Sequence, residues 1–189
     1  GGVPASLGVV QGDGQIPYTA EALARKKENA EHWIDRDPEL KCYVPGAARA
    51  LYLPYPFQIV QGTKKVQLAF AFANAARTIH LDEVDEPPAD TSMGFSKGHW
   101  DGNTLVVETS RFLGTWLDRA GNFYSDSLRL TERFSPISPD AIQYEATFED
   151  PSTFAKPWTI AMPLYRRLEP NVQLLDYPCV EFVEEFMYG

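Results

Sequence analysis

The chain has 189 residues, of which 44% are hydrophobic and 23% charged, and its formal net charge is −9. This length and composition favour one globular domain and exclude a disordered chain, a collagen and a coiled coil. An acidic chain lacks the basic surface that nucleic acids require, so we expect no nucleic-acid partner. Because no apolar run approaches the ~20 residues that span a bilayer, we also expect no membrane insertion.

The N-terminal part of the chain predicts a loose segment followed by a helix. Residues 1–18 are rich in glycine, and we expect them to be flexible, with a single domain over 19–189. Thr19 can cap a helix over residues 20–34, which are rich in helix-forming side chains. Its apolar stripe is thin, which predicts a helix on the outside of a larger structure.

From Phe57 onward the hydrophobic period changes to two, which is typical of β-strands. We expect strands at 57–62, 64–73, 76–82, 95–100, 103–110, 128–134, 141–149, 158–168 and 172–182. Asp101-Gly102 is a strong hairpin signal. About eight or nine strands without alternating helices predict an all-β fold. We interpret it as one antiparallel, lipocalin-like β-barrel with the N-terminal helix outside and room for side chains or a small ligand.

The strand around Glu132 carries the strongest chemical signal in the sequence. Alternation places Glu132 on the same face as Leu130 and Phe134, which points its carboxylate inward. A carboxylate is expensive to bury unless it is paired, and a positioned carboxyl group can act as a general acid or base. The next strand points Tyr144 into the same interior, and Arg166 lies near the barrel mouth, where it could partner an acid. The alternative is a purely structural pair inside a β-protein.

A 14-residue loop over 114–127 mixes aromatic side chains with both signs of charge. Long loops in compact domains are often functional, although this one could equally be held by its own salt bridges. We predict that Asp118 joins Glu132 and Tyr144 as a catalytic residue. The residues predicted to bind substrate are Trp116, Arg119 and Asp126 in the loop, together with Trp158 and His99.

No motif for a metal or a cofactor is present, so we predict neither. The histidines at 32, 80 and 99 form none of the usual ligand patterns. Residues 94–98 match the GxSxG pattern of serine hydrolases, but a hairpin follows them in place of the strand-to-helix turn that this motif needs.

The two cysteines, Cys42 and Cys179, leave two alternatives open. They could be buried free thiols, or one disulfide that ties the start of the core to its end. We favour the disulfide, which implies an oxidising compartment.

Several motifs in one order resemble a family of uncharacterised exported bacterial proteins. They are GHWDGNTLVV at 98–107, TWLD at 115–118, TERF at 131–134 and KPWT at 156–159. The resemblance covers about residues 38–180 and implies a secreted or periplasmic protein, which supports the disulfide. The family is lipocalin-like only in outline and implies no activity, so no catalytic role is carried over. His99 departs from the basic residue expected at its position.

Two functional hypotheses follow. The first is a cofactor-independent general acid/base enzyme, of the lyase, isomerase or cyclase type, acting on a small molecule inside the barrel. The second is a non-catalytic binding or carrier protein for an apolar or aromatic small molecule. A packed barrel that serves as an interaction module is a third option, and the oligomeric state stays open. A Glu132 carboxylate that lines a cavity open to solvent would favour the enzyme. A carboxylate sealed against an arginine would move the search to the outer loops and to partner proteins.

Overall fold

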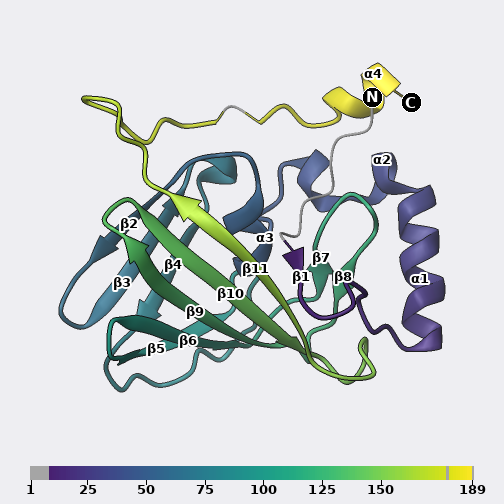
Figure 1. The fold of residues 1–189 in the computed structure, drawn as a ribbon. Coiled ribbons are helices and arrows are strands. Elements are labelled where there is room, and N and C mark those ends of the chain that lie inside the picture. Colours follow the sequence, from purple (N-terminus) through teal and green to yellow (C-terminus); the bar gives the residue numbers. More distant parts are fainter. Residues whose placement is uncertain (1–8, 178, 189) are drawn as a thin grey trace.

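A nine-stranded sheet forms the body of the protein, with helices grouped beside it (Figure 1). The computed structural model describes residues 9–177 and 179–188. The strand order is β1-β11-β10-β9-β6-β5-β4-β3-β2. The strands are β1 (Val9–Val10), β2 (Phe57–Gln61), β3 (Lys65–Phe70), β4 (Ala76–His80), β5 (Phe95–Asp101), β6 (Thr104–Ser110), β9 (Arg129–Ser138), β10 (Ala141–Glu149) and β11 (Trp158–Tyr165).

The predicted closed, purely antiparallel β-barrel is wrong. The sheet is open, because β1 and β2 form its two edges and do not pair with each other. It is also mixed, because β4 and β5 run parallel, with Ile79 opposite Ser96. Parallel neighbours need a long connection, because the chain must run from the end of β4 back to the same end at which β4 began. The acidic, proline-containing stretch 81–94 forms this connection. A period of two identifies strands, but it does not say whether the first and last strands of a sheet meet.

One face of the sheet carries the core. Along β9 the side chains of Leu130, Glu132 and Phe134 are buried, whereas Arg129 and Thr131 are exposed. The same alternation holds in β3 and β10, so the buried rows of successive strands stack on one another. The sheet curls around this face, and side chains from β2 and β10 line one common cleft.

Helices and a short ribbon lie beside the sheet, from the middle of Figure 1 to its right-hand side. They comprise α1 (Ala20–Glu31), α2 (Trp33–Arg36), α3 (Ala47–Tyr52) and the ribbon of β7 (Thr115–Trp116) with β8 (Phe123–Tyr124). Short 3-10 helices occur at Pro38–Lys41 and Phe72–Asn74. The predicted cap is confirmed, because Thr19 Oγ1 accepts a hydrogen bond from Ala22 N at 3.2 Å. None of the described helices is long and apolar enough to cross a membrane.

The predicted flexible segment 1–18 is described only from Val9 onward. Residues 1–8 lie outside the described part of the chain. From Val9 the chain lies against the sheet, where Val9 and Val10 pair with Ala161 and Ile160 of β11. Gln11 N extends this contact by donating to Thr159 O at 2.8 Å.

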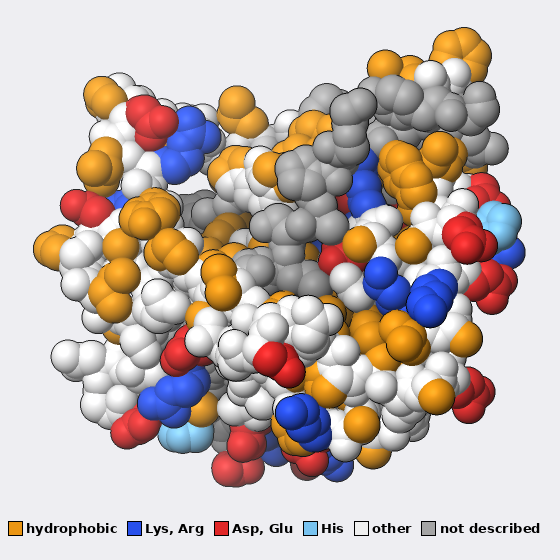
Figure 2. Space-filling view, turned by 45° about the vertical axis from the view of Figure 1, so that its right-hand side comes forward, with side chains coloured by type: hydrophobic (Ala, Val, Ile, Leu, Met, Phe, Trp, Pro, Cys, Tyr) orange, Lys and Arg blue, Asp and Glu red, His pale blue; other side chains and the backbone are white. Residues whose placement is uncertain are grey.

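The C-terminal segment, residues 166–188, contains no strand among its described residues, so the strand expected at 172–182 is wrong. It crosses the top of Figure 1 in irregular structure and ends in α4 (Val183–Tyr188). The predicted disulfide is confirmed and joins this segment to Cys42 through Cys179, with an S–S length of 2.07 Å. Figure 2 shows hydrophobic side chains that stand out of the surface at its top, over this segment. The most exposed are Leu168, Leu175, Val180, Phe186 and Met187.

Candidate functional site

A closed network of polar side chains surrounds Glu132 in the middle of the core. Arg77 Nη1 on β4 donates to Glu132 Oε1 at 2.9 Å, and Arg77 Nη2 donates to Oε2 in a second, short hydrogen bond. The Tyr144 hydroxyl on β10 donates to Oε1 at 2.8 Å. Both carboxylate oxygens are therefore occupied, in the bidentate arrangement that suits an arginine–carboxylate pair.

Two hydroxyl side chains complete the partners of Arg77. Its Nε donates to Ser96 Oγ at 3.0 Å and its Nη2 to Thr109 Oγ1 at 2.7 Å. Burial by itself lowers the pKa of Arg77, but the charge and hydrogen bonds of Glu132 outweigh it and raise the pKa above its ordinary value. Burial, reinforced by the Glu132 charge, raises the pKa of Tyr144 well above normal. The network is thus a fixed ion pair with a tyrosine that stays protonated.

The structure seals this network from solvent. Glu132 and Tyr144 are 0% exposed and Arg77 only 3%. Glu132 and Tyr144 do meet inside the protein, as the alternation predicted, but the arginine partner is Arg77. Arg166 is exposed and lies 3.9 Å from Asp140. A catalytic role for Glu132 and Tyr144 stays a prediction.

Sequence reasoning missed Arg77, although a signal was present. In the stretch 76–80, Arg77 is in phase with Ile79, which is 0% exposed. The alternation of the strand therefore points Arg77 inward as clearly as it does Glu132. A buried arginine is stable only when its charge is paired, for which a buried carboxylate is suited. The alternation along β9 predicts that Glu132 is such a carboxylate.

Asp118 and Arg119 lie away from Glu132, beside the β7–β8 ribbon. Asp118 is buried and accepts hydrogen bonds from Ala120 N at 2.9 Å and Asn122 Nδ2 at 2.8 Å. Burial raises the pKa of Asp118, and these hydrogen bonds partly oppose the rise. Arg119 Nε donates to Glu39 Oε2 at 3.1 Å. The loop is therefore held by hydrogen bonds of its own and by an ion pair with Glu39, which lies outside the loop.

Glu39 belongs to a second buried ionic network. Arg49 in α3 makes a bidentate pair with Asp37, at 2.7 and 2.8 Å, and a further hydrogen bond of 2.6 Å to Glu39 Oε2. Arg49 and Asp37 are 2% and 0% exposed. The network fixes the Pro38–Lys41 turn that precedes Cys42 and is a structural support for that end of the molecule.

The other predicted substrate-binding residues are scattered. Trp116 is buried against Ala22 and Phe123. Trp158 is buried and stacks on Phe148 with ring centroids 4.4 Å apart. Asp126 and His99 are exposed, His99 beside Trp100 at the end of β5. The predicted site residues therefore do not share one cavity.

An apolar cleft opens at the end of the curled sheet, at the turns of the β2–β3 and β5–β6 hairpins. Its inner part has a volume of about 170 Å³. Its lining side chains are uncharged and come from β2 to β10, namely Ile59, Gln61, Val66, Leu68, Ile79, Trp100, Asn103, Leu105, Phe134, Pro136 and Ile142. Because these residues come from seven strands and a turn, no single sequence motif predicts the cleft.

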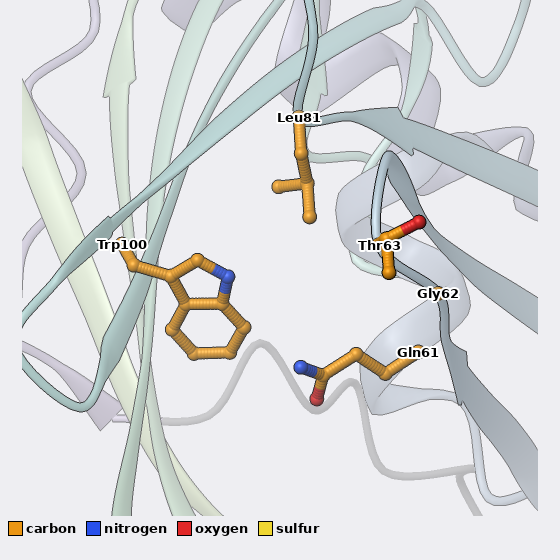
Figure 3. A pocket seen from close by; sticks show the side chains of 5 residues that line it. All are labelled: Gln61, Gly62, Thr63, Leu81 and Trp100. Carbon is orange, nitrogen blue, oxygen red and sulfur yellow. The ribbon is translucent and has the colours of Figure 1, made fainter.

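A wider depression of about 530 Å³ forms the mouth of the cleft and shares Gln61 and Trp100 with the inner part. Figure 3 shows Trp100 reaching from β5 toward Gln61, with Leu81 above and Thr63 at the β2–β3 turn on the opposite side. Trp100 is 46% exposed, which is unusual for so large an apolar side chain. The tryptophan therefore stands as one wall of an open, uncharged mouth.

Gly98 shapes the floor beside Trp100. A Cβ at position 98 would lie 2.7 Å from Ile79 Cγ2, which is a clash, and 3.3 Å from Leu81 Cδ2, which is a tight contact. Glycine at this position therefore lets the Ile79 side chain approach the β5 backbone closely. In the GHW sequence at 98–100, the glycine allows close packing on β5 and the tryptophan exposes an aromatic ring. These two roles explain the first residues of the GHWDGNTLVV motif at 98–107.

No group of three or more metal-ligating side chains occurs within residues 9–177 and 179–188. Comparison of the chain with protein-family models, curated proteins and solved structures finds no match. The resemblance to exported bacterial proteins therefore stays a prediction.

Proposed function

We propose that the protein is a non-catalytic binding or carrier protein for a neutral apolar or aromatic small molecule, held in the cleft beside Trp100. The observation that carries this proposal is the lining of the cleft, which is apolar inside, uncharged throughout and flanked by an exposed tryptophan. Concave, mostly apolar pockets with a few polar groups at their edge are typical of small-molecule sites.

The dimensions support a ligand with one ring inside the cleft. An apolar cavity of about 150 Å³ is sufficient to bind benzene, and the inner part of this cleft has about 170 Å³. A larger ligand extends into the mouth, where Gln61 and Thr63 offer neutral hydrogen-bonding groups. A charged ligand is disfavoured because no lining side chain would compensate its desolvation.

The general acid/base enzyme is less well supported than binding. The cleft lining contains no acidic, basic or tyrosine side chain, so no lining group is available to exchange a proton with a ligand. Neither Glu132 nor Tyr144 lines the cleft, because both are 0% exposed, and Tyr144 packs against Phe134 with ring centroids 5.0 Å apart. The acid/base enzyme therefore stays a prediction, and we favour the binding function.

We also infer that the protein works in an oxidising compartment, secreted or periplasmic. The disulfide between Cys42 and Cys179 supports this inference, because such bonds persist outside the reducing cytosol.

A fluorescence titration tests the binding proposal. N-phenyl-1-naphthylamine is a neutral aromatic probe whose emission rises when it leaves water. We expect saturable binding to the wild-type protein and an affinity about tenfold lower for Trp100→Ala, as for a tryptophan that is central to an interface. Ile142→Trp, which fills the cleft from β10, should weaken binding by a similar or larger factor.

Tyr165→Ala is the matched control, because Tyr165 is an aromatic side chain on β11 that is 76% exposed and outside the cleft. Its affinity for the probe should equal that of the wild type. Equal affinities for Trp100→Ala, Ile142→Trp and Tyr165→Ala would refute the proposal, as would the absence of any saturable binding.

A further inference from the structure

The polar side chains at the mouth of the cleft have no partners within the described fold. They are Gln61, Thr63 and Asn103, all neutral and all exposed. None of them makes a side-chain hydrogen bond to another residue of the described chain, 9–177 and 179–188. Beside the cleft, by contrast, Thr104 Oγ1 and Ser135 Oγ lie 2.9 Å apart and bond each other. The donors and acceptors at the mouth are therefore available to a ligand.

Two pairs of charged side chains flank the mouth. Lys64 Nζ at the β2–β3 turn lies 3.7 Å from Asp82 Oδ2. At the β5–β6 hairpin, Arg133 Nη2 donates at 3.0 Å to Oδ2 of Asp101, which follows Trp100 in the chain. Surface pairs of this kind contribute little stability, but their opposite charges cancel at the distance of a bound ligand. Recognition in the mouth therefore depends on neutral groups.

Trp100 and Gln61 face each other across the mouth (Figure 3). The Trp100 ring is 46% exposed and offers a flat apolar surface. A carboxamide carries both a carbonyl acceptor and an NH2 donor, so Gln61 can bind two neighbouring hydroxyl groups at once. Asn103 supplies a second carboxamide from the β5–β6 turn. An aromatic face with carboxamides beside it matches a pyranose sugar, whose ring has an apolar C–H face and a rim of neutral hydroxyl groups.

We propose that the cleft takes a neutral glycoside with an aromatic aglycone. The aglycone occupies the inner part, of about 170 Å³, and the sugar ring stacks on Trp100 in the mouth, of about 530 Å³. Gln61 and Asn103 bind the hydroxyl groups of the sugar. This inference rests on the proposed function, because the same apolar inner part must bind the aromatic ring.

Other ligand classes fit the two parts of the cleft less well. A phosphorylated or carboxylated ligand would meet no lining cation. A wholly apolar ligand that filled the mouth would remove the carboxamides from water without giving them partners, which costs free energy. A free sugar would forgo the hydrophobic contribution that comes from burying an aromatic ring in the inner part.

Displacement of N-phenyl-1-naphthylamine measures this preference. The competitors are phenyl β-D-glucopyranoside, phenyl β-D-galactopyranoside and anisole, which has the same aromatic ether without the sugar. We expect the better glycoside to displace the probe at about a tenfold lower concentration than anisole, because its hydroxyl groups gain hydrogen bonds. Phenyl β-D-glucuronide, whose sugar carries a carboxylate, should displace the probe less well than the glucoside.

Gln61→Leu removes one carboxamide at nearly constant volume and should lower the preference for the glycoside over anisole about threefold or more. Gln58→Leu is the matched control, because Gln58 is an exposed glutamine of the same strand whose alternation directs it away from the cleft. It should leave the preference unchanged.

The outcomes separate the glycoside inference from the binding proposal. Saturable binding of the probe, with neither glycoside preferred over anisole, overturns the glycoside inference and leaves the binding proposal standing. An equal preference in Gln61→Leu and the wild type also overturns the inference, and so does displacement by the glucuronide that is as strong as displacement by the glucoside. The absence of saturable probe binding overturns both.

Discussion

Arg77 and Glu132 form a buried ion pair in which each guanidinium nitrogen and each carboxylate oxygen has a hydrogen-bond partner. Such pairs tolerate burial only when the attraction and the hydrogen bonds together offset the loss of hydration. Ser96, Thr109 and Tyr144 supply the additional hydrogen bonds. The network joins β4, β5, β6, β9 and β10, and it holds the two halves of the curled sheet together just behind the cleft.

We predict that Glu132→Gln destabilises the protein by about 3–5 kcal/mol, because it leaves the Arg77 charge buried without a counter-charge. Chemical denaturation measures the change in the free energy of unfolding. Under the binding proposal, the variant that remains folded should bind N-phenyl-1-naphthylamine nearly as well as the wild type.

Glu108→Gln provides the control, since Glu108 is exposed on the neighbouring strand β6 and its replacement should cost little. The double variant Glu132→Leu/Arg77→Met removes both charges and should be more stable than Glu132→Gln alone. If Glu132→Gln proved as stable as Glu108→Gln, the ion pair would not hold the core together.

Individual residues show how far a simple alternation rule reaches. It predicts the inward direction of Glu132 and Tyr144, because both follow the period of their strands. Applied to Arg166, the same rule fails, because β11 ends at Tyr165 and the rule has no meaning beyond the last paired residue. Which charged groups meet depends on the order of the strands, and the sequence does not state that order.

At the scale of elements, the strands predicted between residues 57 and 168 all exist, with ends shifted by a few residues. The segment 172–182 is different. Leu174 and Leu175 are adjacent, which breaks the alternation, and Asn171 adopts a left-handed conformation with φ of 58°. Tyr177 N donates to Ala71 O, and the Tyr177 ring packs at a tilt against Tyr55, with ring centroids 4.2 Å apart. Tertiary contacts therefore hold this segment in place of a strand ladder.

We predict that the double variant Cys42→Ser/Cys179→Ser has a clearly lower melting temperature than the wild type. The disulfide closes a loop with a sequence separation of 137 residues. The chain-entropy model gives an upper limit of about 5 kcal/mol for such a loop. Differential scanning calorimetry measures the difference.

A reducing agent supplies the control for this prediction. Because Cys42 and Cys179 are the only cysteines, it should lower the melting temperature of the wild type and leave the double variant unchanged. Identical melting curves for the oxidised and reduced wild type would mean that the C-terminal segment stays anchored without the bond.

At the scale of the whole molecule, the open sheet creates both the cleft and the free edge. A closed barrel would have paired β2 and left no unsatisfied backbone groups there.

The sequence alone determined the β-rich class, the positions of most strands, the capped N-terminal helix and the inward direction of Glu132. These features depend on local periodicity and on capping chemistry, which act over short stretches of chain. For the two cysteines the sequence favoured a disulfide over free thiols, and the structure shows the bond. The tertiary structure decided that the sheet stays open, that Arg77 neutralises Glu132, and that residues from β2 to β10 meet in an uncharged cleft beside Trp100. Those outcomes depend on strand order and curvature, which arise from contacts between residues far apart in the chain.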